Sequence, residues 1–178
     1  TKIPFKKIIC VLTICSLVFV VNAWCQQHLR FFDDAPLKSG NIRLTVLYPS
    51  LGDLKALTQL REFGLINIEG LIVIGLYHEK QLTDFEGSIR FAQEEGHQWI
   101  KFHELKRDLD PTKLFQKNAL SNELHKIYSY SDGLILFGGA DIPPSVYKEK
   151  TGFLTHITTP IRSYLDTMVA FHLLGGWQ

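Results

Sequence analysis

A short strand that runs into two glycines is the part of this chain whose residues could do chemistry. The apolar run from Leu134 to Phe137 is flanked by glycines and is too short for a helix, which predicts a central strand of a parallel sheet. Gly138 and Gly139 follow at the carboxyl end of that strand, where parallel sheets bind ligands. Glycines allow backbone conformations that a Cβ forbids and let N–H groups approach a ligand closely, so the turn could present amide donors to a developing oxyanion. Taken alone, the pattern also fits a tight turn that only reverses the chain.

Two side chains of the loop after the glycines are candidates for contact with a substrate. Asp141 either contacts a substrate ammonium or caps the turn at Pro143 and Pro144. Tyr147 either lines the substrate pocket or packs against the edge of the sheet. The residues alone leave both pairs of alternatives open.

The same string carries a resemblance to a known family. From Asp132 to Pro144 the chain reads DGLILFGGADIPP, with Tyr147 three residues on. It resembles the DGLLLPGG-x-D-I-x-P-x-x-Y segment of the gamma-glutamyl-gamma-aminobutyrate hydrolase family, in the class I glutamine amidotransferase-like superfamily. Other segments resemble a secreted bacterial branch of this family: 77–80, 114–118 and 147–151. The likeness extends over residues 41–178 and is most specific over 131–147.

One helix segment resembles the family in spacing only. Family members carry Arg-Asp-x-x-Glu at the head of the helix before the catalytic strand, and here Arg162 and Tyr164 stand in a segment with the same spacing. Ser163 and Asp166 depart from the family residues, which leaves the helix prediction intact and removes the basis for a shared side-chain role.

The resemblance implies a thiol amidase. Such an enzyme hydrolyses a gamma-glutamyl amide with a cysteine on a strand-to-helix elbow, a histidine base and an acid that orients the histidine. Gly138 and Gly139 would supply backbone amides to the oxyanion hole. The elbow would follow the next strand, beyond Leu174, and no cysteine lies after Cys25. The nucleophile cysteine and base histidine are therefore expected downstream, and this chain alone is expected to be inactive.

The expected partner is a small gamma-glutamyl substrate, with no cofactor, and a homodimer is left open. The alternative function is a non-catalytic, exported binding or interaction domain that retains the glycine turn. Its exposed apolar sheet edge would be an aggregation hazard.

The histidines beside acidic residues do not suggest a metal site. His78 precedes Glu79 and His103 precedes Glu104, but adjacent residues on a strand point to opposite faces, and no pair has the spacing of a metal-binding helix. We expect solvated loop or strand-end histidines and no metal ligands.

The amino end has the three parts of a secretory signal peptide. Two lysines precede an apolar stretch of 14 residues from Ile8 to Val21, shorter than the ~20 residues needed to span a bilayer as a helix. Cleavage after Ala23 fits the small-residue rule. Residues 1–23 are thus predicted to be a signal peptide, and the protein to be exported to the periplasm or the extracellular space, with no stable membrane span after cleavage.

Other interpretations of this end stay open. They are a cut just before Gln26, an uncleaved anchor, and a lipid attached to Cys25. Cys10 and Cys15 lie in the apolar stretch and leave with it, so the mature chain has at most one cysteine and no internal disulfide. The polar residues 24–40 are expected to form a flexible leader.

Charge argues against nucleic acid as a partner. Removing residues 1–23 takes away three lysines and no acidic residue, which changes the formal net charge from +1 to −2. The sequence has no RNA-binding signature or zinc spacing. The one methionine is Met168, so the sequence is expected to begin after the initiator. Residues 24–178 suffice for one domain with a core of its own.

From Asn41 onward, strand-like and helix-like segments alternate, which predicts an α/β fold with a mainly parallel sheet. The expected strands are 42–48, 71–77, 99–105 and 134–137. The expected helices are 54–63, 83–95 with Thr83 as N-cap, 111–130 with a break near Asn118, and 160–174. This is part of a flavodoxin-like three-layer sandwich, incomplete at the carboxyl-terminal side. The resemblance implies that residues 41–178 are the amino-terminal part of a glutamine amidotransferase-like domain.

Overall fold

The computed structural model of the chain describes residues 29–34, 40–139, 141–157 and 159–176. The predicted signal peptide, its cleavage site at Ala23 and the cysteine at position 25 lie outside the described residues.

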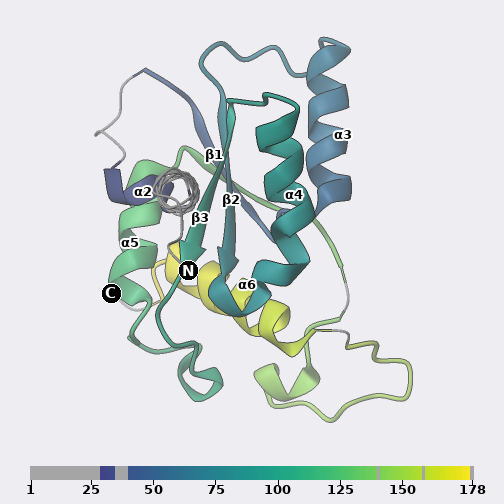
Figure 1. The fold of residues 1–178 in the computed structure, drawn as a ribbon. Coiled ribbons are helices and arrows are strands. Elements are labelled where there is room, and N and C mark those ends of the chain that lie inside the picture. Colours follow the sequence, from purple (N-terminus) through teal and green to yellow (C-terminus); the bar gives the residue numbers. More distant parts are fainter. Residues whose placement is uncertain (1–28, 35–39, 140, 158, 177–178) are drawn as a thin grey trace, which may run out of the picture.

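Four parallel strands form one sheet at the centre of the molecule (Figure 1). They are β1 (Arg43–Leu47), β2 (Ile72–His78), β3 (Ile100–Leu105) and β4 (Gly133–Leu136). Their order is β3-β2-β1-β4, the order in which a doubly wound sheet begins. In register, Leu47 of β1 lies between Leu76 of β2 and Leu136 of β4.

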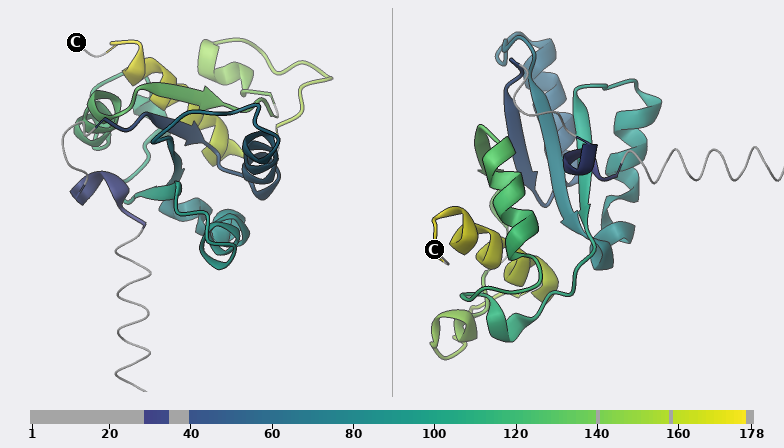
Figure 2. Two further views of the ribbon diagram at one scale, coloured as in Figure 1. Left: turned by 90° about the horizontal axis from the view of Figure 1, so that it is seen from above. Right: turned by 90° about the vertical axis from the view of Figure 1, so that its left-hand side faces the viewer.

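Helices cover both faces of this sheet, which makes the fold a flavodoxin-like three-layer sandwich (Figure 1, Figure 2). On one face lie α3 (Leu51–Glu62) and α4 (Leu82–Glu94), whose Leu54 and Phe85 are fully buried. On the other lie α5 (Ser121–Tyr130) and α6 (Pro160–Leu173), whose Leu124 and Met168 are fully buried. Strands between two helical layers are usually apolar on both sides, which is why the apolar run in β2 is almost continuous. The predicted fold class is confirmed.

The helices predicted over 54–63, 83–95 and 160–174 lie close to α3, α4 and α6, but the helix predicted over 111–130 was too long, because α5 begins only at Ser121. One predicted cap was also wrong. Thr83 is not the N-cap of α4, because the short 3-10 helix η1 (Glu79–Gln81) runs directly into α4 and Gln81 takes the cap position. The predicted break near Asn118 is confirmed. The Asn118 side chain donates to two backbone carbonyls and accepts from the Leu120 amide between η2 (Pro111–Lys113) and α5.

Part of the segment predicted to be a flexible leader belongs to the packed structure. Residues 31–34 form a short helix, α2 (Phe31–Asp34), and Phe32 is only 1% exposed. Arg30 forms an isolated antiparallel bridge with His103, so this segment covers the β3 edge of the sheet. The sequence analysis did not predict this docking, because the charged residues beside Phe32 made the segment look like solvated chain.

The opposite edge of the sheet is formed by β4, which the sequence predicted to be a central strand. Within the described residues β4 pairs only with β1, and Leu136 is 49% exposed. Its apolar composition suits a strand with neighbours on both sides, but the described chain supplies only one. No helix in the described part of the chain has the length and hydrophobicity to cross a membrane.

Candidate functional site

The carboxyl ends of β1 and β4 define the point where a doubly wound sheet binds its ligand. From β1 the chain moves outward through β2 to β3, and then crosses to the other side of β1 to form β4. The loops that leave β1 and β4 therefore diverge toward opposite faces of the sheet. A crevice at such a switch point is the usual ligand site of open α/β sheets. Tyr48 and Pro49 follow β1 here, and the two glycines of the sequence pattern follow β4.

Arg162 connects these two strand ends. It lies in the first turn of α6, and its Nη2 donates to the carbonyl oxygens of Phe137 at 3.1 Å and Gly138 at 2.9 Å. Its guanidinium carbon lies 3.9 Å from the centre of the Tyr48 ring, within the range of a cation–π contact. One side chain thus fixes the glycine turn after β4 to the loop after β1.

Gly139 is required by this arginine and not by its backbone angles. A Cβ at Gly139 would overlap three atoms of the Arg162 guanidinium, so a larger residue would have to displace the arginine. A Cβ at Gly138 would meet nothing within 4 Å. The sequence had suggested that the two glycines allow a special backbone conformation. This is not the reason for the pair, because neither glycine has a φ in the left-handed region.

The amides of the glycine turn are available to a ligand. Both Gly138 and Gly139 are exposed, and neither N–H donates a hydrogen bond to any described residue. Unpaired backbone donors are uncommon in folded proteins except where water or a ligand takes them. That these amides donate to an oxyanion stays a prediction.

Tyr48 holds an unusual backbone conformation at the same place. Its φ is 51°, in the left-handed region that non-glycine residues seldom adopt, and its carbonyl accepts a hydrogen bond from the Ser50 amide at 2.7 Å. Ser50 then caps α3 by accepting from the Asp53 amide. Strain of this kind concentrates at functional sites, because surrounding contacts must maintain it.

Asp166 lies one helical turn beyond Arg162. Its Oδ2 is 3.5 Å from Arg162 Nε, and its Oδ1 is buried without a hydrogen-bond partner among the described residues. Burial raises the pKa of the Asp166 carboxyl, against the opposing effect of the arginine charge. The pair orients the guanidinium but leaves the carboxylate imperfectly satisfied.

The two loop residues that were candidates for substrate contact, Asp141 and Tyr147, lie in the segment between β4 and α6. The Asp141 amide donates to the His156 carbonyl at 3.1 Å, and Asp141 Oδ2 accepts from the His156 amide at 2.9 Å. Asp141 therefore closes the base of the loop between β4 and α6. Tyr147 ends the short helix η3 (Pro144–Tyr147) and is 58% exposed.

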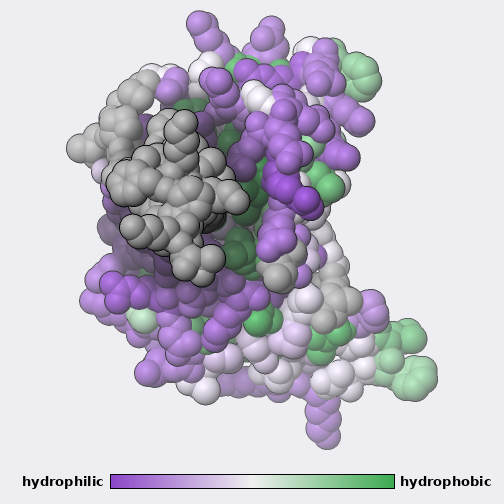
Figure 3. All heavy atoms as spheres, viewed as in Figure 1, coloured by the Kyte–Doolittle hydropathy of each residue, from purple (hydrophilic) through white to green (hydrophobic). Residues whose placement is uncertain are grey.

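The loop closed by Asp141 projects from the body of the protein. Figure 3 shows hydrophobic atoms at its tip, in the lower right of the view, where Figure 1 places the segment between η3 and α6. Phe153 and Leu154 in this segment are almost fully exposed.

An apolar groove lies at the other end of β4. It encloses about 250 Å³ between α5, α6 and the amino end of β4, with Leu134, Ile127 and Val169 in its wall. Because Asp132 and Gly133 border it, the groove is separated from Gly138 by the length of the strand.

The histidines predicted to be solvated are buried. His78 and His103 are both 0% exposed. The His78 Nδ1 accepts from the Lys80 amide, and its Nε2 lies 2.8 Å from the Arg107 carbonyl. The prediction of solvated histidines was wrong because packed segments enclose both His78 at the end of β2 and His103 within β3, and the adjacent charged residues hide that burial in the sequence.

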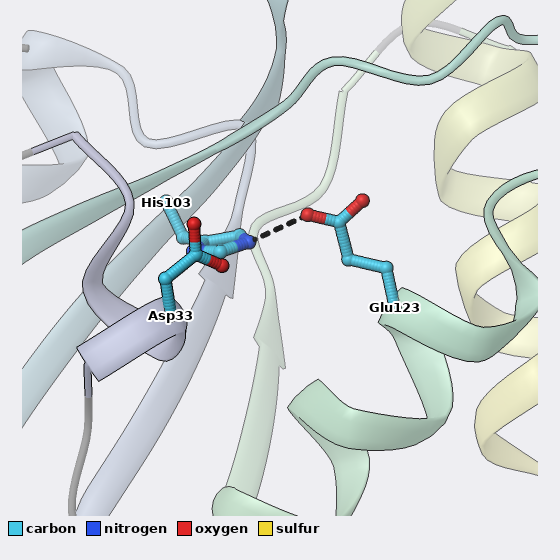
Figure 4. Close-up of side chains that lie close together, drawn as sticks. All are labelled: Asp33, His103 and Glu123. Atoms are coloured by element: carbon cyan, nitrogen blue, oxygen red, sulfur yellow. Dashed lines mark hydrogen bonds and ion pairs between the residues drawn. The ribbon is translucent and has the colours of Figure 1, made fainter.

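His103 belongs to a second polar cluster, which also includes Asp33 and Glu123 (Figure 4). The His103 Nδ1 accepts from the Phe32 amide at 3.1 Å, so its Nε2 carries the proton that lies between it and Glu123 Oε1 at 3.0 Å. Arg30 donates to Asp33 at 2.6 Å and to Glu123 at 2.9 Å. Both ring nitrogens are occupied and an arginine lies between the carboxylates, so this donor set is committed to internal pairing and not to a cation.

Charge in this cluster is internally compensated. The hydrogen bond from Arg30 lowers the pKa of Asp33. Burial opposes ionisation of Glu123, but the hydrogen bond from His103 and the charge of Arg30 outweigh it and lower the pKa of Glu123. The cluster ties α2 to β3 and α5.

Comparisons with known proteins identify no relative of this chain. No protein-family model, no curated protein and no solved structure matches it. The fold and the switch-point geometry are therefore the basis for a functional hypothesis.

Sequence reasoning found the glycine turn but missed the side chains that support it. Arg162 was recognised only for its spacing, and Tyr48 only as the end of a strand. Contacts between residues 48, 138 and 162 depend on strand order, and no local pattern encodes that order. Nor does a local pattern signal the left-handed conformation of Tyr48, because a residue before proline usually adopts extended backbone.

Proposed function

We propose that this chain is the amino-terminal part of a cysteine-dependent hydrolase of gamma-glutamyl amides, of the glutamine amidotransferase-like type, acting outside the cytoplasm. The observation that carries the proposal is the pair of exposed amides at Gly138 and Gly139, which have no acceptor in the described chain and lie at the switch point of a doubly wound sheet. The resemblance of residues 131–147 to the hydrolase family names the reaction.

The amides would act on the acyl group of the substrate. A cysteine thiolate attacks the amide carbon, a C–S bond forms, and the carbonyl oxygen becomes an oxyanion. Donors already aimed at that oxygen favour the transition state over the ground state, and one such donor contributes about 3 kcal/mol in comparable enzymes. Collapse of the intermediate breaks the C–N bond, and the amine leaves with a proton from the histidine. Water then cleaves the thioester to give the gamma carboxylate of glutamate and to regenerate the thiolate.

The described chain would contribute binding and oxyanion stabilisation, but not the nucleophile. Residues 26–178 contain no cysteine. A cysteine and a histidine on elements that follow α6 would have to complete the site beside Gly138.

The experiment is an assay of the protein expressed from the full open reading frame. We expect release of p-nitroaniline from gamma-L-glutamyl-p-nitroanilide, and loss of this activity after treatment with iodoacetamide. The matched control substrate is alpha-L-glutamyl-p-nitroanilide, which places the scissile amide on the other carboxyl group and should not be cleaved. Absence of cleavage, or cleavage that iodoacetamide leaves intact, contradicts the proposal. In the first case, retained binding of a gamma-glutamyl ligand would favour the non-catalytic binding domain.

A further inference from the structure

We propose that Arg162 is a positioning residue that sets the direction of the Gly138 and Gly139 amides, so that they can donate to a carboxylate or oxyanion. The inference rests on the proposed function, because it concerns the same turn. It adds the residue that makes the turn competent and the class of ligand group that the turn binds.

Peptide geometry connects the arginine to the amides. In a trans peptide the C=O and N–H bonds point in opposite directions. The Phe137 carbonyl belongs to the same peptide unit as the Gly138 N–H, and the Gly138 carbonyl to the same unit as the Gly139 N–H. The protein has no cis peptide bond within its described residues. Since both carbonyls accept from Arg162 Nη2, both N–H groups must point away from the guanidinium.

The arginine is itself held from three directions. The Tyr48 ring lies under the guanidinium, Asp166 lies beside Nε, and the missing Cβ of Gly139 leaves room for close approach. The Arg162 side chain is only 15% exposed, so it has little freedom to leave the carbonyls. A planar guanidinium suits such a site better than a lysine ammonium, because it can stack on the ring and donate from its edge at once.

The charge of Arg162 makes the turn suited to an anion. Arg162 neutralises part of the negative end of two peptide dipoles, which leaves the positive N–H ends facing outward. A full positive charge behind the turn also favours an anion in front of it. The local electrostatics are therefore those of an anion site and not those of a cation site.

The experiment follows the amide signals of Gly138 and Gly139 in 15N–1H spectra of the full chain during titration with sodium acetate, at ionic strength held constant with sodium chloride. The variants are Arg162→Met, which keeps an apolar stem, and Arg162→Lys, which keeps the charge. Arg90→Met is the matched control, because Arg90 is an exposed arginine on α4.

In the wild-type protein and in Arg90→Met, we expect saturable shifts at one or both glycine amides. In Arg162→Met, acetate should bind at least tenfold more weakly at these amides, with an intermediate loss in Arg162→Lys. If Arg162→Met does not fold, the comparison of acetate affinity between Arg162→Lys and the wild-type protein still tests the role of Arg162. Wild-type affinity in both Arg162 variants, or no saturable glycine shift in the wild-type protein, overturns the inference.

This test separates the inference from the proposed function. If the acetate shifts depend on Arg162 but the protein cleaves no gamma-glutamyl amide, the anion site is supported and the amidase proposal is contradicted. If Arg162→Met cleaves the amide at an unchanged rate, the amidase proposal is supported and the role of Arg162 is contradicted.

Discussion

Two arginines at opposite edges of the sheet are used in different ways. Arg30 lies at the β3 edge and pairs with the carboxylates of Asp33 and Glu123, so that charges of both signs are satisfied within the protein. Arg162 lies at the β4 side and donates to the carbonyls of Phe137 and Gly138, while the amides of the same peptide units have no acceptor among the described residues. The Arg30 cluster stabilises the fold. In our proposal, the Arg162 cluster leaves its two glycine amides for a ligand.

The two clusters should therefore respond differently to mutation. Removing a partner from the Arg30 cluster should cost stability, because a charge or a ring nitrogen is left unsatisfied. Removing a partner from the Arg162 cluster should cost ligand binding more than stability.

The largest expected effect is that of Glu123→Ala. Glu123 is partly buried and accepts from both Arg30 and His103, so its loss removes the acceptor of the buried His103 Nε2 and one of the two carboxylates that pair with Arg30. We expect the free energy of unfolding to fall by about 2–3 kcal/mol, measured by urea denaturation at pH 7. The matched control is Glu94→Ala, an exposed glutamate on α4 that should change stability by less than about 0.5 kcal/mol. Equal effects of the two variants would show that the cluster contributes no stability.

Alanine substitutions at Gly138 and Gly139 test whether contact with Arg162 controls anion binding. Gly139→Ala places a Cβ on the Arg162 guanidinium and must displace it, whereas Gly138→Ala meets no atom within 4 Å. We expect Gly139→Ala to weaken anion binding about tenfold, or about 1.4 kcal/mol. Gly138→Ala should weaken it less than about threefold, as measured by the same amide titration. A larger effect at position 138 than at 139 would contradict the role given to the arginine.

A smaller effect is expected at the aromatic ring. Tyr48→Leu keeps an apolar side chain but removes the face on which Arg162 stacks. A cation–π contact at a partly exposed site contributes about 0.5–1 kcal/mol, so anion affinity should fall two- to fivefold. Tyr48→Phe is the control, because it retains the ring and should bind like the wild-type protein. If Phe and Leu behave alike, the ring does not hold the arginine.

The pH dependence of stability should have opposite signs in the two clusters. The pKa of Glu123 is lowered, so its contribution is present above its ordinary value of 4.5 and is lost as the pH falls through the lowered folded-state pKa. The pKa of Asp166 is raised by burial, so its contribution is present below 3.8 and is lost as the pH rises through the raised pKa. Relative to the wild-type protein, Glu123→Gln should therefore lose stability as pH rises from 3 to 7, while Asp166→Asn should gain it.

Urea denaturation of these two variants and of the wild-type protein across that pH range provides the measurement. Slopes of the same sign for Glu123→Gln and Asp166→Asn would contradict the distinction between a satisfied and an unsatisfied carboxylate.

The sequence predicted the layers of the fold well, and the partners of its polar residues poorly. Apolar runs and helical spacing located the strands and helices, because burial on both faces of a parallel sheet leaves a continuous local signal. The burial of His78 and His103, the docking of Phe32 and the contact of Arg162 with Gly139 depend on segments far apart in the chain. The number of strands that pair with β4 was not predictable for the same reason, since the composition of β4 does not reveal it.

The glycine turn shows the same limit within the site. Its place at the carboxyl end of a strand was predictable from the sequence. The reason for Gly139 was not, because it lies in the side chain of a residue more than twenty positions away.

Titration of the 15N-labelled wild-type protein with gamma-L-glutamylglycine tests the central claim most directly, with alpha-L-glutamylglycine as the control ligand. The account predicts that the gamma-linked dipeptide causes saturable shifts at the Gly138 or Gly139 amide and that the alpha-linked dipeptide does not. Saturable binding of the gamma-linked dipeptide with both glycine amides unmoved would contradict it.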